Sequence, residues 1–403
     1  MAGIMDCKSY HQAAHLEGVS SRFVGIESAT AKRVFTGAHP CQGMYWTPTG
    51  AKPSVSFFLV HYSTDFTEHY LAGPLSARGY GVLGFNTRFR GNDEVFILEE
   101  ALDDIAAGMQ WLRDIGGAEK IVFIGNSGGG SLGAAYQATA QQNPSWVAAD
   151  AFIFLNAHLG RPDGLTNWLD PSVVDETDPV KTDASLDMYN PANTVPYSKE
   201  FISRYRAAQR ERNQRITDWA KAELKRLNDV GIPDRIFPIY RATADLRFND
   251  PTIDPSNRTT PSSYLGDPAK ANRGIPLFGR TTTLRTWLSM WSLEDSKCRL
   301  EPYLTELHVP TFVIQGDADA GIFPPETHHI YNLVAAQDKE LKMVPGGHIF
   351  TYDPENLRNV INVILEWVSQ RLSKRGTGTK QLNGEGWNIE SHLRTDEKDL
   401  HLN

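Results

Sequence analysis

The chain has 403 residues, 48 of them acidic and 40 basic, which gives a formal net charge of −8. This charge argues against a nucleic-acid partner, because phosphate contacts need a basic face. Hydrophobic residues make up 40% of the chain and charged residues 22%, which excludes a disordered, collagen-like or coiled-coil protein. The length allows two or three domains, or one α/β domain with a large insertion.

The cysteine content and the lack of long apolar runs indicate the cellular compartment that the protein occupies. Cys7, Cys41 and Cys298 are widely spaced and form no C-x-x-C pair, so the sequence predicts neither a disulfide framework nor a cysteine zinc site. Asp6 and Lys8 interrupt the N-terminus before an apolar stretch develops, and no run approaches the ~20 apolar residues of a membrane span. We therefore expect a cytoplasmic protein with no membrane span.

From about residue 54, short β-rich apolar runs alternate with helical patterns, which is typical of βαβ units on a parallel sheet. The predicted strands are residues 55–60, 81–85, 121–124 and 151–155, with a helix over 98–112. The alternation returns with strands over 309–314 and 341–344 and a helix over 357–372. The sequence therefore predicts one sheet built from two separated parts of the chain.

Residues 160–302 do not keep this alternation and are predicted to be a mainly helical insertion, with helices over 198–229 and 281–293. The first half of the helix over 198–229 carries a cluster of five arginines interleaved with acidic residues, and we interpret the cluster as a solvated basic face without a functional role. They are Arg204, Arg206, Arg210, Arg212 and Arg215. The predicted organisation is a first half of the core with an N-terminal extension (1–159), the insertion (160–302), a second half (303–373) and a flexible polar tail (374–403).

The segment Ile121-Val-Phe-Ile-Gly-Asn-Ser-Gly-Gly-Gly130 contains G-x-S-x-G centred on Ser127, with a strand pattern before it and a helix pattern after it. A serine nucleophile on a sharp strand-to-helix turn needs this context, because only small neighbours fit there. A second match, centred on Ser131, would lie a turn inside the helix, where its hydroxyl would bond a backbone carbonyl. A phosphate-binding turn is the competing interpretation, but no P-loop lysine or dinucleotide fingerprint accompanies it.

A serine nucleophile needs a base and a group that orients the base. Asp317 and Asp319 follow the predicted strand at 309–314, and His348 follows the next strand. The carboxyl ends of parallel strands hold the sites of open α/β sheets. The chain order Ser127, Asp319, His348 is the order expected for a serine, acid and histidine on such a sheet. Asp317 is the alternative acid, although it directly follows the strand and can cap the turn instead.

Outside the insertion, residues 54–373 resemble the α/β-hydrolase superfamily. Three features carry this resemblance: the sharp strand-to-helix turn from Gly125 to Gly129, called the elbow below, Asp319 in a G-x-x-D pattern, and the late His348. It implies an α/β fold with a mostly parallel, doubly wound sheet and a cap inserted after the sixth strand, here residues 160–302. It also implies the catalytic residues Ser127, Asp319 and His348.

The resemblance further implies an oxyanion hole made by the backbone N–H groups of Gly128 and Ser63, with Tyr62 as the alternative to Ser63. The family commonly has a His-Gly pair where this chain has His61-Tyr62, so a side chain stands where glycine is common. We predict that His61 and Asn126 support the site from a second layer.

The implied reaction is hydrolysis of a carboxylic ester, thioester or lactone through an acyl-enzyme. Aromatic residues of the insertion suggest a small apolar or aromatic substrate; they are Trp168, Tyr189, Trp287 and Trp291. A carbon–carbon bond hydrolase of a β-diketone would use the same three residues. A non-catalytic binding protein with the same fold is the alternative from another class.

The remaining predictions concern secondary candidates, metals, cofactors and partners. Asp163 lies just past the strand at 151–155, a position from which some superfamily members draw their acid. His158 ends the same strand and is a second-layer candidate. No H-E-x-x-H or EF-hand spacing occurs, so we predict neither a metal site nor a cofactor. The expected partner is a small-molecule substrate, and a homodimer is compatible with the sequence.

Overall fold

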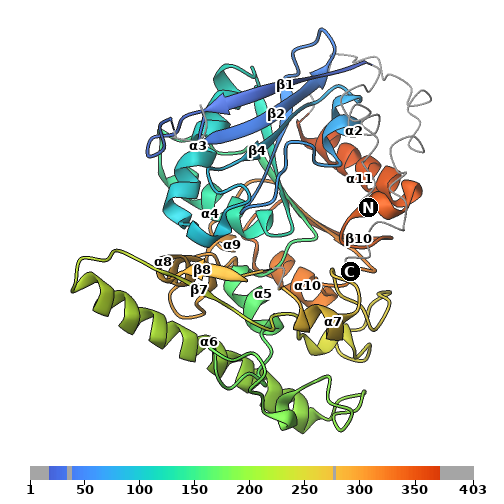
Figure 1. The fold of residues 1–403 in the computed structure, drawn as a ribbon. Helices are drawn as coiled ribbons and strands as arrows, with labels where there is room; N and C mark the ends of the chain where they lie inside the picture. The colour runs from blue at the N-terminus through green and yellow to red at the C-terminus, as the bar shows by residue number, and fades with distance from the viewer. Residues whose placement is uncertain (1–17, 34–38, 276–277, 373–403) are drawn as a thin grey trace, which may run out of the picture.

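The computed structural model describes residues 18–33, 39–275 and 278–372 (Figure 1). The predicted tail at 374–403 lies outside the described residues. An eight-stranded sheet has the order β1-β2-β4-β3-β5-β6-β9-β10. Its strands are β1 (Val19–Ile26), β2 (Cys41–Pro48), β3 (Val55–His61), β4 (Gly81–Asn86), β5 (Lys120–Asn126), β6 (Ala151–Leu155), β9 (Thr311–Gly316) and β10 (Lys339–Val344).

The sheet is mostly parallel, as predicted, and joins two separated parts of the chain. Only β2 runs antiparallel to its neighbours, β1 and β4, while β6 pairs in parallel with β9 across the long intervening segment. The sequence did not predict β1 and β2. Buried residues alternate irregularly with half-buried ones in β2, and with half-buried and exposed ones in β1, because these two strands lie toward one edge of the sheet and lack the continuous apolar run of a central strand.

Helices cover both faces of the sheet, which confirms the predicted doubly wound arrangement. Successive side chains of a strand point to opposite faces, so Phe57 and Leu59 of β3 belong to one buried cluster and Phe58 and Val60 to the other. The first cluster packs under α2 (Ala72–Ser76) and α11 (Pro354–Leu372). The second packs under α3 (Leu98–Asp114), α4 (Gly129–Gln142), α9 (Glu301–Leu304) and α10 (Pro324–Leu333).

The segment between β6 and β9 adds no strand to the eight-stranded sheet within the described ranges. It contains the helices α5 (Arg161–Trp168), α6 (Lys199–Asn228), α7 (Pro268–Arg273) and α8 (Leu284–Thr286), and the short strand pair β7 (Ile236–Pro238) and β8 (Thr281–Thr283). In Figure 1 this segment forms the lower part of the molecule, with α6 along its outer edge. It therefore contributes a separate layer beside the sheet.

Two predictions for this segment need correction. The helix expected over 281–293 begins as β8, continues as α8 and ends as a π-helical turn over Trp287–Trp291, since three successive threonines favour extended backbone. The arginines of α6 do not form a uniformly solvated face. Arg212 is fully buried and binds Glu176 at 2.7 Å, because neighbouring loops fold over that side of the helix.

Among the described residues, no helix is both long enough and apolar enough to cross a bilayer.

Candidate active site

Ser127 lies in the tight turn between β5 and α4, with a backbone φ of +54°. Few residues other than glycine adopt this left-handed conformation, and strain of this kind gathers at functional sites. The glycines around it permit close packing. A Cβ on Gly129 would lie 2.4 Å from the carbonyl oxygen of Val60, and one on Gly125 would lie 2.6 Å from the Cα of Gly130. The turn is thus the strand-to-helix elbow that the sequence predicts.

His348 and Asp319 come together at the carboxyl ends of β10 and β9, the edge of the sheet where Ser127 also lies. Nδ1 of His348 is 2.7 Å from Oδ2 of Asp319. The other carboxylate oxygen, Oδ1, accepts hydrogen bonds from the backbone N–H groups of Gly321 at 2.8 Å and Ile322 at 3.0 Å. A carboxylate only accepts, so Nδ1 carries the hydrogen and Nε2 is left as an acceptor for a serine proton.

The alternative acids lie elsewhere. Asp317 accepts hydrogen bonds from the side chain of Asn257 at 2.9 Å and from the N–H of Gly346 at 3.1 Å. It therefore connects the loop after β9 to the loops that contain Asn257 and Gly346. Asp163 forms an ion pair with Arg299 at 3.0 Å. Neither carboxylate contacts the imidazole of His348 in the part of the chain that the structure describes.

Tyr264, from the segment between β6 and β9, touches both members of this pair. Its hydroxyl donates to Oδ1 of Asp319 at 2.7 Å, and its oxygen lies 2.9 Å from Nδ1 of His348. The tyrosine ring packs against the imidazole with 4.5 Å between ring centres. A Cβ at Gly321 would clash with this ring at 2.2 Å, so the glycine makes room for it. No pattern in the sequence singles out Tyr264.

Ser131, the alternative nucleophile, is fully buried. Its hydroxyl bonds the carbonyl oxygen of Gly128 at 3.3 Å, as the sequence predicts for a serine inside a helix, and it also lies 3.0 Å from the hydroxyl of Tyr62. The Tyr62 side chain, which replaces the common glycine, is therefore turned into the interior. The carbonyl of Ser63, in the loop predicted to supply the oxyanion donors, accepts from the N–H of Gly91 at 2.7 Å.

Asn126, predicted as a supporting residue, is buried behind Ser127. Its amide nitrogen donates to the carbonyl of Leu155 at 2.8 Å, and its amide oxygen lies 3.0 Å from Nε2 of His69. His69 also accepts the N–H of Leu71 through Nδ1 at 3.3 Å. Asn126 thus ties the end of β5 to β6 and to the loop before α2.

Asn156, which no pattern in the sequence singles out, links the two parts of the sheet at the site. Its side-chain oxygen accepts the N–H of Gly316 at 2.7 Å, and its nitrogen donates to the carbonyl of His348 at 2.9 Å. Its φ of +45° lies in the left-handed region that asparagine tolerates best among non-glycine residues. The end of β6 therefore holds the loop that carries His348.

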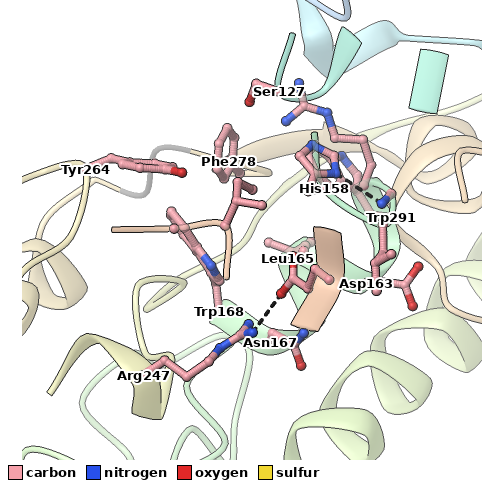
Figure 2. Close-up of a pocket in the computed structure, with 17 residues that line it drawn as sticks. Ser127, His158, Asp163, Leu165, Asn167, Trp168, Arg247, Tyr264, Phe278 and Trp291 are labelled. Atoms are coloured by element: carbon pink, nitrogen blue, oxygen red, sulfur yellow. Dashed lines mark hydrogen bonds and ion pairs between the residues drawn. The ribbon is translucent and has the colours of Figure 1, made fainter. Parts of the chain in front are cut away.

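A pocket of about 540 Å³, including its opening to solvent, lies beside Ser127. Figure 2 shows Ser127 at one end and Arg247 at the other, with Phe278, Trp168 and Leu165 between them. Of the aromatic residues proposed to shape a substrate site, Trp168 and Trp291 line this pocket. Trp287 is a core residue whose indole N–H donates to Thr217, and Tyr189 donates its hydroxyl to the carbonyl of Thr243.

Two histidines beside the pocket are held neutral. Burial lowers the pKa of His61 well below its ordinary value, and the positive charge of Arg161 lowers it further. The same two causes lower the pKa of His158. Nδ1 of His158 accepts the N–H of Gly160 at 3.0 Å, so the ring hydrogen lies on Nε2. The imidazole of His61 lies against Gly128: a Cβ on Gly128 would be 2.8 Å from Nε2 of His61.

No group of three or more histidine, cysteine or acidic side chains suited to a metal ion occurs within residues 18–33, 39–275 and 278–372. The arrangement instead offers a hydroxyl on a strained turn, an imidazole oriented by a carboxylate, and a pocket lined by aromatic rings. These parts suit covalent catalysis by a nucleophilic serine.

Comparison with known proteins identifies the family. A family model described as the alpha/beta hydrolase fold matches residues 59–354. Human monoglyceride lipase is 29% identical over 133 residues, a match that spans 32% of this chain and 40% of the human protein. A solved structure titled as DcsB in complex with its substrate analogue has a TM-score of 0.51 at 14% identity, covering 88% of this chain and 100% of the other.

A monoacylglycerol lipase from Paleococcus ferrophilus shows a TM-score of 0.43 at 15% identity, covering 87% of this chain and 98% of that one. At 14% identity the first of these two structures speaks for the fold alone, and the second adds no argument to it. The family model, which spans more than half of the chain, agrees with the sheet order and the elbow at Ser127, so this protein belongs to the alpha/beta hydrolase fold family.

Proposed function

We propose that this protein is a serine hydrolase that cleaves a carboxylic ester, or a thioester or lactone, of a small substrate through an acyl-enzyme. The observation that carries the proposal is the pair of His348 and Asp319, 2.7 Å apart, at the same edge of the sheet as Ser127 on its strained turn. The printed name of the human relative, a monoglyceride lipase, supports an ester as the bond and leaves the substrate itself open.

In this mechanism the hydroxyl of Ser127 attacks the carbonyl carbon while Nε2 of His348 accepts its proton. The carboxylate of Asp319 stabilises the imidazolium, which then gives the proton to the leaving alcohol. The N–H groups of Gly128 and Ser63 are the proposed donors to the oxyanion. Water, activated by the same imidazole, adds to the acyl-enzyme and releases the acid and free serine.

We also propose that residues 160–302 act as a cap. Trp168, Tyr264, Phe278 and Trp291 all belong to this segment and line the pocket together with Ser127. Aromatic walls favour an apolar or aromatic portion of the substrate. The assignment of residues 1–159 and 303–373 to one catalytic core, the cytoplasmic location and a homodimer stay predictions.

Labelling with a fluorophosphonate, followed by peptide mapping, tests the proposal without knowledge of the substrate. We expect the label on Ser127, its loss in Ser127→Ala, and its retention in Ser131→Ala. The turnover of a simple ester should fall by about 10⁴-fold or more in Ser127→Ala. An unlabelled wild-type protein would favour a non-catalytic binding role, and a label that moves with Ser131 would overturn the assignment.

A further inference from the structure

We propose that Arg161 is the anion-binding side chain of the pocket and that the natural substrate carries a carboxylate bound by this guanidinium. This inference rests on the proposed hydrolase function and adds a substrate class to it: an acyl compound with a free acid group near the scissile bond.

Arg161 begins α5 and lines the same pocket as Ser127. It is buried, with 4% of its surface exposed. Three aromatic rings surround its guanidinium carbon, at 4.4 Å from the ring centre of Tyr62, 5.1 Å from Phe278 and 5.7 Å from Trp291. A planar guanidinium stacks on such rings and is held in one orientation. The charge is therefore placed in a defined position in the pocket.

The hydrogen-bonding capacity of Arg161 is largely unused within the described part of the chain. Its Nε is buried without a hydrogen-bond partner. Its Nη2 lies 3.4 Å from Nε2 of His61, while the N–H of Thr64 lies 3.3 Å from the other nitrogen of the same ring. A neutral imidazole accepts through only one nitrogen. At least one of these two long contacts is therefore not a full hydrogen bond.

The acidic groups that line the pocket are already paired with other arginines. Asp163 binds Arg299 at 3.0 Å, and Glu326 binds Arg247 at 2.7 Å. The charge of Asp93 acts on Arg161 from a distance, but the described residues contain no ion pair between them. Arg161 thus remains a buried cation without a carboxylate partner, an arrangement that costs stability unless an anion enters.

The position of Arg161 brings it to the reacting centre. A Cβ on Gly128 would lie 2.9 Å from its Nη2, so the guanidinium borders the residue that follows the nucleophile. His158 supplies a second donor at the pocket, because its Nδ1 accepts from Gly160 and its hydrogen lies on Nε2. The two oxygens of a carboxylate match the fork of a guanidinium. A neutral acyl chain would leave these donors unpaired.

Matched pairs of esters test the proposal. The first pair is p-nitrophenyl hemisuccinate against p-nitrophenyl butyrate, which places the acid on the acyl side. The second is 4-acetoxybenzoate against 4-acetoxybenzamide, which places it on the leaving group. In at least one pair we expect the wild-type protein to prefer the anionic member in kcat/KM by roughly tenfold or more, because a neutral analogue leaves buried donors unpaired.

The variant Arg161→Met should reduce the ratio of kcat/KM between the anionic and the neutral ester by about tenfold or more. Methionine keeps a similar side-chain volume but lacks the paired N–H donors of the guanidinium. Arg371→Met is the matched control, because the Arg371 guanidinium also stacks on an indole, that of Trp367 at 4.5 Å, but on α11. Its ratio should equal that of the wild type. A wild-type ratio of one or less in both pairs, or an unchanged ratio in folded Arg161→Met, overturns the proposal.

Binding to Ser127→Ala protein separates this inference from the proposed reaction and needs no change at Arg161. In whichever series the kinetics favour, calorimetric titration should detect the anion, monoethyl succinate or 4-acetoxybenzoate, and show much weaker binding of its neutral partner, ethyl butyrate or 4-acetoxybenzamide. Equal affinities would overturn the role of Arg161 even if Ser127 is labelled by the fluorophosphonate. The opposite outcome is also distinguishable. If the wild-type protein is never labelled at Ser127 but the Ser127→Ala variant binds the anion selectively, the anion site stands and the proposed hydrolase function is rejected.

Discussion

Asp319 is the most highly bonded carboxylate of the proposed site. Its Oδ1 accepts from two backbone N–H groups and from the hydroxyl of Tyr264, and its Oδ2 faces His348. Each donor holds the carboxylate in place, and each also draws negative charge away from the oxygen that faces the imidazole. Tyr264 is therefore a positioning residue that acts on His348 through Asp319.

We predict that Tyr264→Phe lowers kcat for a neutral ester by about 3- to 30-fold and leaves KM close to the wild-type value. Asp319 loses one of its three Oδ1 donors and holds the imidazole less well in the orientation that accepts the serine proton. Steady-state kinetics at one pH measure kcat and KM separately.

The control is Tyr197→Phe, since the hydroxyl of Tyr197 donates to the carbonyl of Met188 and lies in a different cluster of the same segment. Its kcat and KM should both match the wild type. A Tyr264→Phe protein with an unchanged kcat, or one that loses only substrate affinity, would contradict a role through Asp319.

Residues that carry a local pattern could be proposed from the sequence, and their catalytic roles stay predictions. Ser127 lies in a pentapeptide with a strand before it and a helix after it, and Asp319 and His348 each follow a predicted strand. Tyr264 and Arg161 carry no such pattern. Tyr264 is 55 residues from Asp319 and 84 from His348, and only folding of the intervening chain brings them together.

At the scale of elements, the crossing of α4 over the sheet depends on glycines. The backbone at Gly129 approaches the carbonyl of Val60 so closely that a Cβ would lie 2.4 Å from its oxygen. That neighbour is main chain in a central strand, which cannot rotate away as a flexible side chain can.

We predict that Gly129→Ala destabilises the protein by about 1–3 kcal/mol, because α4 must shift away from β3. Gly164→Ala in α5 is the control, since its Cβ would meet nothing within 4 Å. Helix propensity predicts that this control gains about 0.4–1 kcal/mol. Urea unfolding measures both, and equal stabilities of the two variants would contradict the packing argument.

Elements of the central sheet were predictable, whereas edge strands and the segment between β6 and β9 were less so. Central strands are buried on both faces and show as apolar runs. The strands β1 and β2 have mixed patterns and depend on pairing with β4 through β2. The burial of the α6 arginines was also not predictable from the sequence, because the burial of Arg212 depends on where the loop with Glu176 folds.

At the scale of the whole molecule, the buried neutral histidines make stability depend on pH. Burial lowers the pKa of His69 from 6.5 to about 4, and it is also the largest cause of the lowered pKa of His61 and His158. The unfolded chain takes up protons at these rings below about pH 6.5, whereas the folded protein does not. Acid therefore favours the unfolded state over this range.

We predict that the free energy of unfolding falls as the pH drops from about 6.5 to about 4. His69 alone accounts for about 3 kcal/mol of the loss when it is complete near pH 4. His69→Gln should show a shallower decline, because glutamine can still donate to Asn126 but does not titrate. Denaturant unfolding at several pH values measures this, and parallel curves for the two proteins would argue against the contribution of His69.

The sequence by itself determined the parallel sheet, its assembly from two parts of the chain, the elbow at Ser127, and the order of serine, acid and histidine. These features follow from periodic burial and from turn chemistry, which act along a single segment. Only the tertiary structure decided that Asp319 rather than Asp317 faces His348, that Asn156 holds the histidine loop, and that Arg161 is left without a carboxylate partner among the described residues. Contacts of this kind join side chains far apart in the sequence, and their partners are set by the path of the folded chain rather than by local pattern.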